Sequence, residues 1–340
     1  MPDMNARRQA VLAIVVQEHI ASGSPVGSMT LVEEYRLKVS PAKIRNEMKA
    51  LEETGLLTHP HTSAGRVPTE EGYRYFVQHL LPDQPLAPTD QRMIQHLFHQ
   101  VGYEKDQWAQ LAAAVLAHSS QMGALATQVR VESARFKHMQ LVEVRPGLVL
   151  LVLVLHAGVV KQQMINLDLA VTQDELSQTS NQLNDLLANL TVSEIGSGSL
   201  ELTSLTQLVL DLVIDTMGRE DSPVSEQVFR EGLSHVLLQP EFATTEDAHQ
   251  LVNVLEQASL LGSIFDNVRS NDGVQILIGG DGRYDALRDL SLVLSRYGVD
   301  RSITGVLGIV GPVRMHYART IPLVRYVAEL MSGLVQEWYT

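Results

Sequence analysis

The spacing of apolar residues changes along this chain, and the change constrains the fold more than any other feature. A helical period of three to four residues marks the first segment, at Leu12, Val15, Val16 and Ile20. Strand-like runs begin at Phe136 and include an unbroken apolar stretch at 148–155. Helical spacing returns over 173–261, and further strands follow it. This order indicates a sheet domain interrupted by a helical insertion.

The first part of the chain predicts three short helices. The first ends at Ser22-Gly23-Ser24-Pro25, and Ser28 is a candidate cap for a second helix over 29–36. Ser40-Pro41 predicts the start of a third helix, because a capping serine precedes a proline at the first helical position. Gly55 ends this third helix.

A two-stranded wing is predicted directly after the third helix. Short strands at 56–59 and 67–68 flank a polar turn, and Thr69 is a plausible cap for a closing helix. Three helices, a hairpin and a closing helix make a winged helix-turn-helix, which is a known plan for reading DNA.

The remaining 260 or so residues predict a linker and several further elements. The proline-rich stretch 81–91 reads as a linker of restricted flexibility. Helices are expected at 91–122, 173–190, 200–217, 225–238, 245–261 and 318–338. Strands are expected within 136–169 and at 274–278, 291–297 and 303–310.

The third helix carries the candidate base-reading residues. Its buried stripe would be Ile44, Met48 and Leu51, which leaves Lys43, Arg45, Asn46 and Lys49 to face outward. Arg45 can read guanine and Asn46 can read adenine, each through two hydrogen bonds. Phosphate contacts are predicted on the second and third helices, at Ser28, Thr30, Ser40, Lys43 and Lys49. The wing could follow the DNA backbone or the minor groove through His61, Thr62, Ser63 and Arg66.

Several of these residues also have purely structural interpretations. Arg45 could form a surface ion pair with Glu47 or Glu52, and Lys49 could simply be solvated. His61 could be an ordinary loop residue.

The charge distribution favours a dimer. The net charge is −13, but residues 1–80 carry nine Lys/Arg and nine Asp/Glu and are neutral. A single neutral module should bind DNA weakly, because affinity depends on neutralising phosphates. Two copies would double the contacts and match a two-fold inverted repeat. The candidate interface is an apolar row, unless this row is only core of its own domain: Leu205, Leu208, Val209 and Leu212.

Other function classes find little support in the sequence. There is no cysteine, which excludes disulfides and thiolate metal sites. No P-loop, zinc-protease or hydrolase motif is present, so we expect neither an enzyme nor a cofactor. His59, His61 and His79 lack the partners of a metal site, and Gly279-Gly280-Asp281-Gly282 is read as a tight turn. No stretch is long enough to span a membrane, which predicts a cytoplasmic protein.

Motifs at both ends of the chain resemble one family. They are PVGSMTL at 25–31, SPAKIRNEMKALEETGLLTHPHTSAGRVPT at 40–69, GYRYF at 72–76, EGLSHVLLQPEF at 231–242, RDLSLVLSRYG at 288–298 and GVLGIVGPVRMHYAR at 305–319. In their order and spacing they resemble the bacterial heat-inducible transcription repressors of the HrcA type.

The resemblance implies a multidomain α+β fold. Its parts would be a winged-helix domain at 1–80, a linker at 81–91, a GAF-like domain at 92–170 and 266–340, and a mainly helical dimerisation domain inserted at 171–265. It further implies a homodimer that represses chaperone operons through an inverted-repeat operator. A chaperonin would keep this repressor active.

One residue departs from the family pattern. Lys43 stands where the family usually has threonine, so the added cation is expected to strengthen phosphate attraction and to alter the base read there. Two other functions are also open: a regulator gated by a small molecule in the GAF-like domain, and a chaperonin client with incidental DNA affinity. Heat could also act directly, by destabilising the fold or the dimer.

Overall fold

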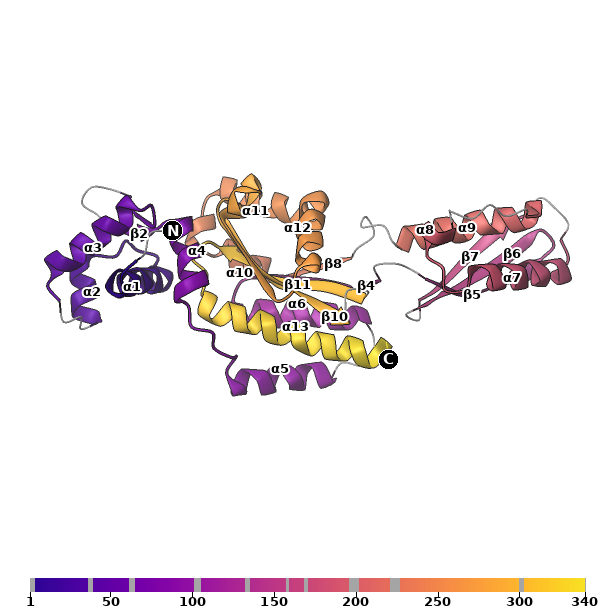
Figure 1. Ribbon diagram of the computed structural model, residues 1–340, viewed down its shortest axis with the longest axis horizontal. Helices are drawn as coiled ribbons and strands as arrows, with labels where there is room; N and C mark the ends of the chain where they lie inside the picture. Colours follow the sequence, from indigo (N-terminus) through magenta and orange to yellow (C-terminus); the bar gives the residue numbers. More distant parts are fainter. Residues whose placement is uncertain are drawn as a thin grey trace. The chain divides into compact units, whose positions relative to one another are not determined.

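A computed structural model of the 340-residue chain describes most of its residues. The described residues are 4–35, 39–60, 65–100, 105–131, 135–156, 159–167, 171–195, 202–220, 227–299 and 303–339. The chain divides into two compact units (Figure 1). One unit comprises Met1–Thr127, Val228–Arg296 and Val306–Met331, and the other comprises Gln128–Gln227, Tyr297–Gly305 and Ser332–Thr340.

The N-terminal part forms three helices, as the sequence predicts: α1 (Ala6–Ser22), α2 (Ser28–Glu34) and α3 (Pro41–Glu53). The Asn5 side chain caps α1 by accepting a hydrogen bond from the backbone N–H of Arg8. Gly23 ends α1 in the left-handed region at φ 66°. The buried side chains of α1 include Leu12, Val15 and Val16, which confirms the predicted apolar face.

The predicted wing and closing helix are also present. Strands β1 (Leu57–Thr58) and β2 (Val67–Pro68) pair antiparallel. Thr69 caps α4 (Glu70–Tyr75) by accepting from the N–H of Gly72, and α4 continues into a π-helical turn, η1 (Phe76–Leu80). Three helices, a hairpin and a closing helix are the winged-helix arrangement.

A six-stranded sheet forms the body of the chain. Its strand order is β8-β3-β11-β10-β9, and β4 pairs with β11 beside this path. The strands are β3 (Gly123–Thr127), β4 (Arg130–Val131), β8 (Val228–Glu231), β9 (Val274–Ile278), β10 (Leu290–Val299) and β11 (Ile303–Pro312). Nearly every residue of β10 and β11 is buried, as expected for a sheet covered on both faces.

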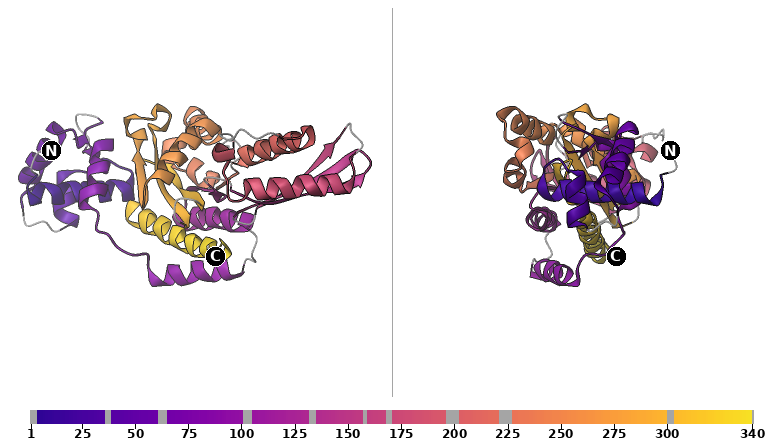
Figure 2. Two further views of the ribbon diagram at one scale, coloured as in Figure 1. Left: turned by 45° about the vertical axis from the view of Figure 1, so that its right-hand side comes forward. Right: turned by 90° about the vertical axis from the view of Figure 1, so that its left-hand side faces the viewer.

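Helices cover the two faces of this sheet (Figures 1 and 2). One face carries α6 (Lys105–Ser120) and α13 (Tyr317–Tyr339), with α5 (Pro88–Gln100) nearby. The other carries α11 (Thr245–Glu256) and α12 (Ala258–Ser270), whose Leu251, Ile264 and Phe265 share a core with Leu292 and Val310 of the sheet. Short turns complete the body: α10 (Leu233–Leu237), η4 (Pro240–Phe242), η5 (Gly279–Gly282) and η6 (Asp285–Leu287).

A separate three-stranded sheet belongs to the segment 128–227, which we call the insert. Its antiparallel order is β5-β6-β7, from β5 (Phe136–Arg145), β6 (Leu148–Leu155) and β7 (Val160–Asn166). One face packs on α7 (Gln173–Leu187) and α9 (Ser204–Glu220), with the short α8 (Val192–Ile195) beside α9. The two ends of the insert meet at neighbouring strands of the body. Thr127, the last residue of β3, lies opposite Val228, the first residue of β8.

Helix α7 also satisfies the outer edge of β5. Asn184 accepts from the backbone N–H of Met139 and donates to its carbonyl, and Ser180 accepts from the N–H of Leu141. Gln173 accepts from the N–H of Glu143. These bonds use backbone groups that an edge strand otherwise leaves open to another strand.

The borders of the insert differ from those predicted, 171–265. The strands β5–β7 belong to the insert, because they share a core with α7 and α9. Helices α11 and α12 belong to the body instead, because they pack on its sheet. Two local predictions are also wrong: the helix expected at 225–238 is β8 followed by α10, and the single helix at 91–122 is α5 and α6, with 101–104 outside the described residues.

Candidate nucleic-acid interface

Helix α3 has one buried side and one exposed side. Ile44, Met48 and Leu51 are at most 3% exposed and pack within the N-terminal helices, since α3 contacts both α1 and α2. The opposite side presents four exposed polar residues: Lys43, Arg45, Asn46 and Lys49. The prediction that these four face outward is confirmed, and their contacts with DNA stay predictions.

The start of α3 suits an anion. Ser40 has an extended backbone (φ −70°, ψ 150°) and Pro41 is the first helical residue, which confirms the predicted start. The exposed Ser40 side chain forms no capping hydrogen bond, so its hydroxyl is open to solvent. The first-turn N–H groups and the positive end of the helix dipole both favour a phosphate here.

The predicted cap of α2 is wrong. Helix α2 begins at Ser28 itself, and Gly27 occupies the cap position with an extended backbone (φ −90°, ψ 152°). Gly27 has no side chain to cap with, and Ser28 and Thr30 are half-buried in the first turn. Their predicted phosphate contacts remain predictions.

Two carboxylates of α3, those of Glu47 and Glu52, are turned toward other parts of the domain and paired there. Glu47 accepts a hydrogen bond from Nε of Arg8 at 3.2 Å. Glu52 accepts from Nε of Arg66 at 2.8 Å and pairs with His59. The two partners that could have neutralised Arg45 are therefore occupied, and Arg45 forms no ion pair with any residue that the structure describes.

Glu52 holds the wing to α3. Partial burial would raise the pKa of Glu52, but hydrogen bonds and positive charge from His59 and Arg66 outweigh it and hold the pKa below its ordinary value. Arg66 is thereby fixed at the base of the wing with its side chain 24% exposed. A contact of Arg66 with DNA would have to use the part of the guanidinium that Glu52 leaves free.

The base of the wing lies against the turn between α1 and α2. Val26 and Arg66 exchange two backbone hydrogen bonds, N to O, of 2.8 and 2.9 Å. A Cβ at Gly65 would lie 2.4 Å from the carbonyl oxygen of Val26, so only glycine fits this approach. The predicted wing contacts His61, Thr62 and Ser63 lie outside the described residues.

Among the residues that the structure describes, the ion-pair partner of Lys49 is Glu53, and the pair is weak. The Nζ of Lys49 lies 3.8 Å from Glu53, with the two side chains 71% and 67% exposed. Such an exposed pair on a helix contributes about 0.3–0.5 kcal/mol. Lys49 therefore remains available to a phosphate.

The predicted dimer residues lie on α9 of the insert, and their exposure differs. Val209 is 1% exposed and fills the core of the insert, so it cannot meet a second chain. Leu205 and Leu212 are partly buried against that core, whereas Leu208 is 45% exposed. Leu205, Leu208 and Leu212 recur at helical spacing and leave a narrow apolar strip open.

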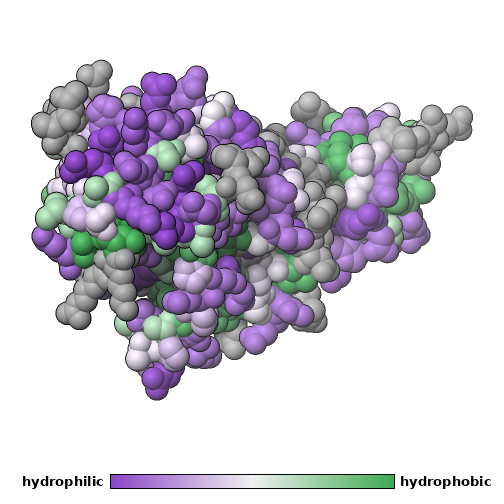
Figure 3. Space-filling model, turned by 60° about the vertical axis from the view of Figure 1, so that its left-hand side comes forward, coloured by the Kyte–Doolittle hydropathy of each residue, from purple (hydrophilic) through white to green (hydrophobic). Residues whose placement is uncertain are grey.

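A larger apolar surface, which we call the outer face, lies on the opposite side of the three-stranded sheet. All eight residues of β6 are apolar, and they alternate between buried and half-buried. On the outer side, Leu150 lies opposite Val142 on one neighbour and Met164 on the other. The most exposed members are Val142 at 39%, Val144 at 53%, Val160 at 53% and Met164 at 50%. Figure 3 shows apolar surface on the insert.

The outer face is not among the surfaces that the sequence predicts. The run 148–155 is apolar at every position, so its own pattern does not show which side of the strand is exposed. The neighbouring strands could have indicated the outer face. Val142 and Val144 of β5 and Met164 of β7 occupy alternate positions among polar residues.

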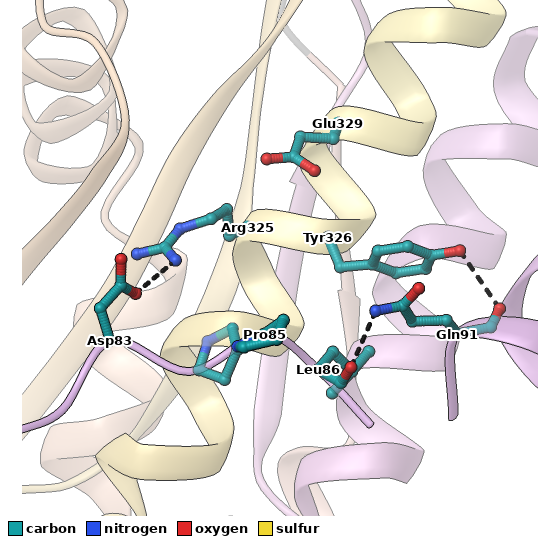
Figure 4. Close-up of a pocket in the computed structure, with 8 residues that line it drawn as sticks. Asp83, Pro85, Leu86, Gln91, Arg325, Tyr326 and Glu329 are labelled. Carbon is teal, nitrogen blue, oxygen red and sulfur yellow. Dashed lines mark hydrogen bonds and ion pairs between the residues drawn. The ribbon is translucent and has the colours of Figure 1, made fainter. Parts of the chain in front are cut away.

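The body contains one cavity worth testing against the small-molecule alternative (Figure 4). It encloses about 250 Å³ and is lined by Asp83, Pro85, Leu86, Gln91, Pro322, Arg325, Tyr326 and Glu329. Most of its polar groups already bind one another: Arg325 to Asp83 at 2.7 Å, the Tyr326 hydroxyl to the Gln91 carbonyl at 3.2 Å, and Gln91 to the Leu86 carbonyl at 2.8 Å. These bonds fasten the linker to α13 and leave few groups for a ligand.

The part of the chain that the structure describes holds neither a metal cluster nor a membrane-spanning helix. No cluster of three or more His, Asp or Glu side chains there could hold a metal ion. None of the helices described is both long enough and apolar enough to cross a membrane.

A winged helix with an exposed cationic α3, joined to an α/β body that carries an insert, defines a multidomain protein of the winged-helix class. Residues 106–321 match the family model described as "HrcA protein C terminal domain". The chain is 45% identical to the heat-inducible transcription repressor HrcA of Roseiflexus sp. (strain RS-1), over 99% of this chain and 96% of that protein. It is 41% identical to the protein of the same name from Chloroflexus aggregans, over 99% and 94%. The chain belongs to the HrcA family.

One solved structure supports the fold. A crystal structure described only as a hypothetical protein at 2.2 Å resolution superposes with a TM-score of 0.57 and covers 99% of this chain and 98% of its own. The two sequences are 23% identical, so the likeness concerns the fold alone.

Proposed function

We propose that this chain is a heat-inducible transcription repressor that occupies a double-stranded DNA operator. The observation that carries the proposal is the charge arrangement on α3. Its cations Lys43, Arg45 and Lys49 are exposed, while Glu47 and Glu52 are paired with other parts of the domain. The relatives are named for this function and match the chain over nearly its whole length.

The proposed contacts divide into base reading and positioning. Arg45 and Asn46 lie on the exposed side of α3, where each can form two hydrogen bonds to a base edge, worth about 1–3 kcal/mol of discrimination. Ser40, Lys43 and Lys49 contact phosphates and set the register, together with Ser28, Thr30 and the wing. Lys43 adds a cation where the family usually has threonine, which should change the preferred base at that point.

The repressor acts as a homodimer that meets an inverted repeat. The first 80 residues are neutral overall, so one copy has little phosphate-neutralising charge to spare. The outer face of the insert is a contiguous apolar surface of the kind that marks a protein contact. A second copy packing there would hold two winged helices together, and the strip around Leu208 on α9 is the rival surface.

The finer domain assignments belong to the same proposal. The body would be the GAF-like domain and the insert the dimerisation domain. The family resemblance implies a chaperonin as the partner that sets the fraction of repressor able to bind DNA. A chaperonin should then raise the fraction of protein able to bind the operator without changing the base preference. As a repressor of bacterial operons, the protein would work in the cytoplasm.

Fluorescence anisotropy on two duplexes tests the proposal. One duplex carries the family's inverted repeat and the other has the same composition in scrambled order, and both are titrated at several salt concentrations. A preference for the repeat of about a thousandfold or more is expected of a specific repressor. Equal, salt-sensitive binding to both duplexes, with and without added chaperonin, would contradict it.

A further inference from the structure

The closing helix of the winged helix contacts the turn η5 through Arg74. Arg74 Nε donates to Asp281 at 3.0 Å, and Nη2 donates to the carbonyl of Ile278 at 3.1 Å. Its remaining nitrogen pairs with Glu71 of the same helix. The side chains of Arg74 and Asp281 are only 25% and 20% exposed, so this ion pair is shielded from solvent far more than the pair at Lys49.

The turn η5 is shaped to receive α4. Gly279, Gly280, Asp281 and Gly282 all have positive φ angles, from 50° to 71°. A Cβ at Gly279 would lie 2.2 Å from the carboxyl carbon of Glu70, so the Glu70 carboxylate occupies the space of the missing side chain. Burial raises the pKa of Glu70, which agrees with a carboxyl group enclosed at this contact.

A second contact joins the body to the end of α1. Arg314, between β11 and α13, donates to the carbonyl of Ile20 at 3.4 Å and also binds Glu241. Its guanidinium lies 3.6 Å from a Cβ built at Gly23, the cap of α1. A cation at this position meets the negative end of the helix dipole and the unpaired last carbonyls.

Aromatic rings close the space between these two contacts. The hydroxyl of Tyr73 on α4 lies 2.6 Å from Nδ1 of His19 on α1. The rings of Tyr73 and Tyr317 are 6.2 Å apart and tilted by 54°, and the Tyr317 hydroxyl donates to Ser291 at 2.9 Å. Both tyrosines are at most 2% exposed, so the contact is dry.

This contact leaves the candidate DNA-facing side of α3 uncovered. The residues that dock on the body come from α1 and α4, whereas Lys43, Arg45 and Lys49 stay exposed. Docking on the body and binding DNA are therefore compatible. The docked state gives α3 a fixed direction relative to the body, which the linker alone would not supply.

We propose that Glu70 and Arg74, with Asp281 in η5 and Arg314, form a latch that positions the recognition helix for two-fold operator binding. The inference rests on the proposed function, because it concerns the spacing of two winged helices in a dimer. Rigid positioning raises the effective concentration of the second winged helix at its half-site. These four residues contact no base in this scheme. They act through the placement of α3.

Asp281→Asn tests the latch without altering the winged helix. It removes the charge that holds Arg74. Asp272→Asn is the control for the loss of a paired carboxylate elsewhere in the body, because Asp272 pairs with Arg296; Asp272 is 73% exposed and Asp281 is 20% exposed. Anisotropy is measured on the full inverted repeat, on a single half-site and on a scrambled duplex. We expect Asp281→Asn to lose about tenfold to a hundredfold on the full repeat and nothing on the half-site. Asp272→Asn should match the wild type on all three.

Each other outcome has a defined meaning. Unchanged or tighter binding of Asp281→Asn to the full repeat overturns the latch, and so does an equal loss on repeat and half-site. A wild-type protein that does not prefer the repeat over the scrambled duplex overturns the proposed function instead. Arg74→Gln is the second variant, and the double variant with Asp281→Asn should be no worse than Arg74→Gln alone, because Arg74→Gln already removes the pair with Asp281. Circular dichroism of each variant confirms folding.

Discussion

Helix α3 and the outer face of the insert both present side chains to solvent, but their chemistry is opposite. The exposed side of α3 is cationic and polar, and the acidic residues Glu47 and Glu52 are paired elsewhere. The outer face is mainly aliphatic, with Val142, Val160 and Met164 between 39% and 53% exposed, and Gln140 and Gln162 flank Val152 on it. One surface suits a polyanion and the other an apolar partner. Salt should therefore weaken the first contact strongly and the second little.

The largest expected effect comes from breaking the apolar contact. Met164→Glu places a charge on the outer face, beside Leu150 of the central strand, so the dimer should dissociate and affinity for the full inverted repeat should fall about a hundredfold or more. Half-site affinity should not change. Sedimentation equilibrium and anisotropy measure the two quantities.

Two further variants are compared with Met164→Glu: a control of matched exposure on α5, and a variant on the alternative surface of α9. Met93 on α5 is 49% exposed against 50% for Met164, and Met93→Glu should leave the dimer intact. A dimer that survives Met164→Glu but dissociates with Leu208→Glu would move the interface to α9.

Base reading by α3 gives the next largest effect. Arg45→Ala should cost about 1–3 kcal/mol on the inverted repeat and little on scrambled DNA, because the lost contact reads a base. Competition anisotropy with both duplexes measures the difference. Equal losses on the two duplexes would assign Arg45 to the phosphate backbone.

Lys49 sharpens the same contrast within one helix. Lys49→Ala should weaken binding to every sequence by a similar factor and reduce the salt slope by about one, since a phosphate contact carries no base preference. A salt titration on both duplexes checks this. A loss confined to the inverted repeat would make Lys49 a base reader.

The smallest expected effect is the loss of folding stability at low pH that depends on the paired carboxylate of Glu52. The pKa of Glu52 is lowered in the folded chain, so its stabilising contribution is present above the unfolded-state pKa and is lost as the pH falls through the folded-state pKa. Thermal unfolding from pH 7 down to about pH 3 should therefore show a steeper loss of stability for the wild type than for Glu52→Gln. Parallel curves would mean that the pairs with His59 and Arg66 add nothing.

Local patterns predicted α3 and its wing well. The spacing of Ile44, Met48 and Leu51 fixed which side of the helix is exposed, and Ser40-Pro41 located its start. These features depend on residues within a few positions of one another, where periodicity and helix-start signals are strong.

Features that depend on distant partners could not be predicted in this way. The pattern around β8 predicts a helix, whereas β8 is a strand because it pairs with β3, which precedes it in the sequence by the whole length of the insert. The ion pair of Arg74 with Asp281 joins residues 207 positions apart, and that of Arg8 with Glu47 joins residues 39 apart. The predicted borders of the insert are wrong for the same reason, because only the packing shows that β5, β6 and β7 share a core with α7 and α9.

The stoichiometry of the complex with the inverted repeat tests the central claim most directly. Light scattering during size-exclusion chromatography gives the mass of the complex, and each chain contributes 37.6 kDa. We expect two chains per duplex on the inverted repeat and no discrete complex on the scrambled duplex at the same salt concentration. One chain per repeat, or the same complex on both duplexes, would contradict a dimeric operator-binding repressor.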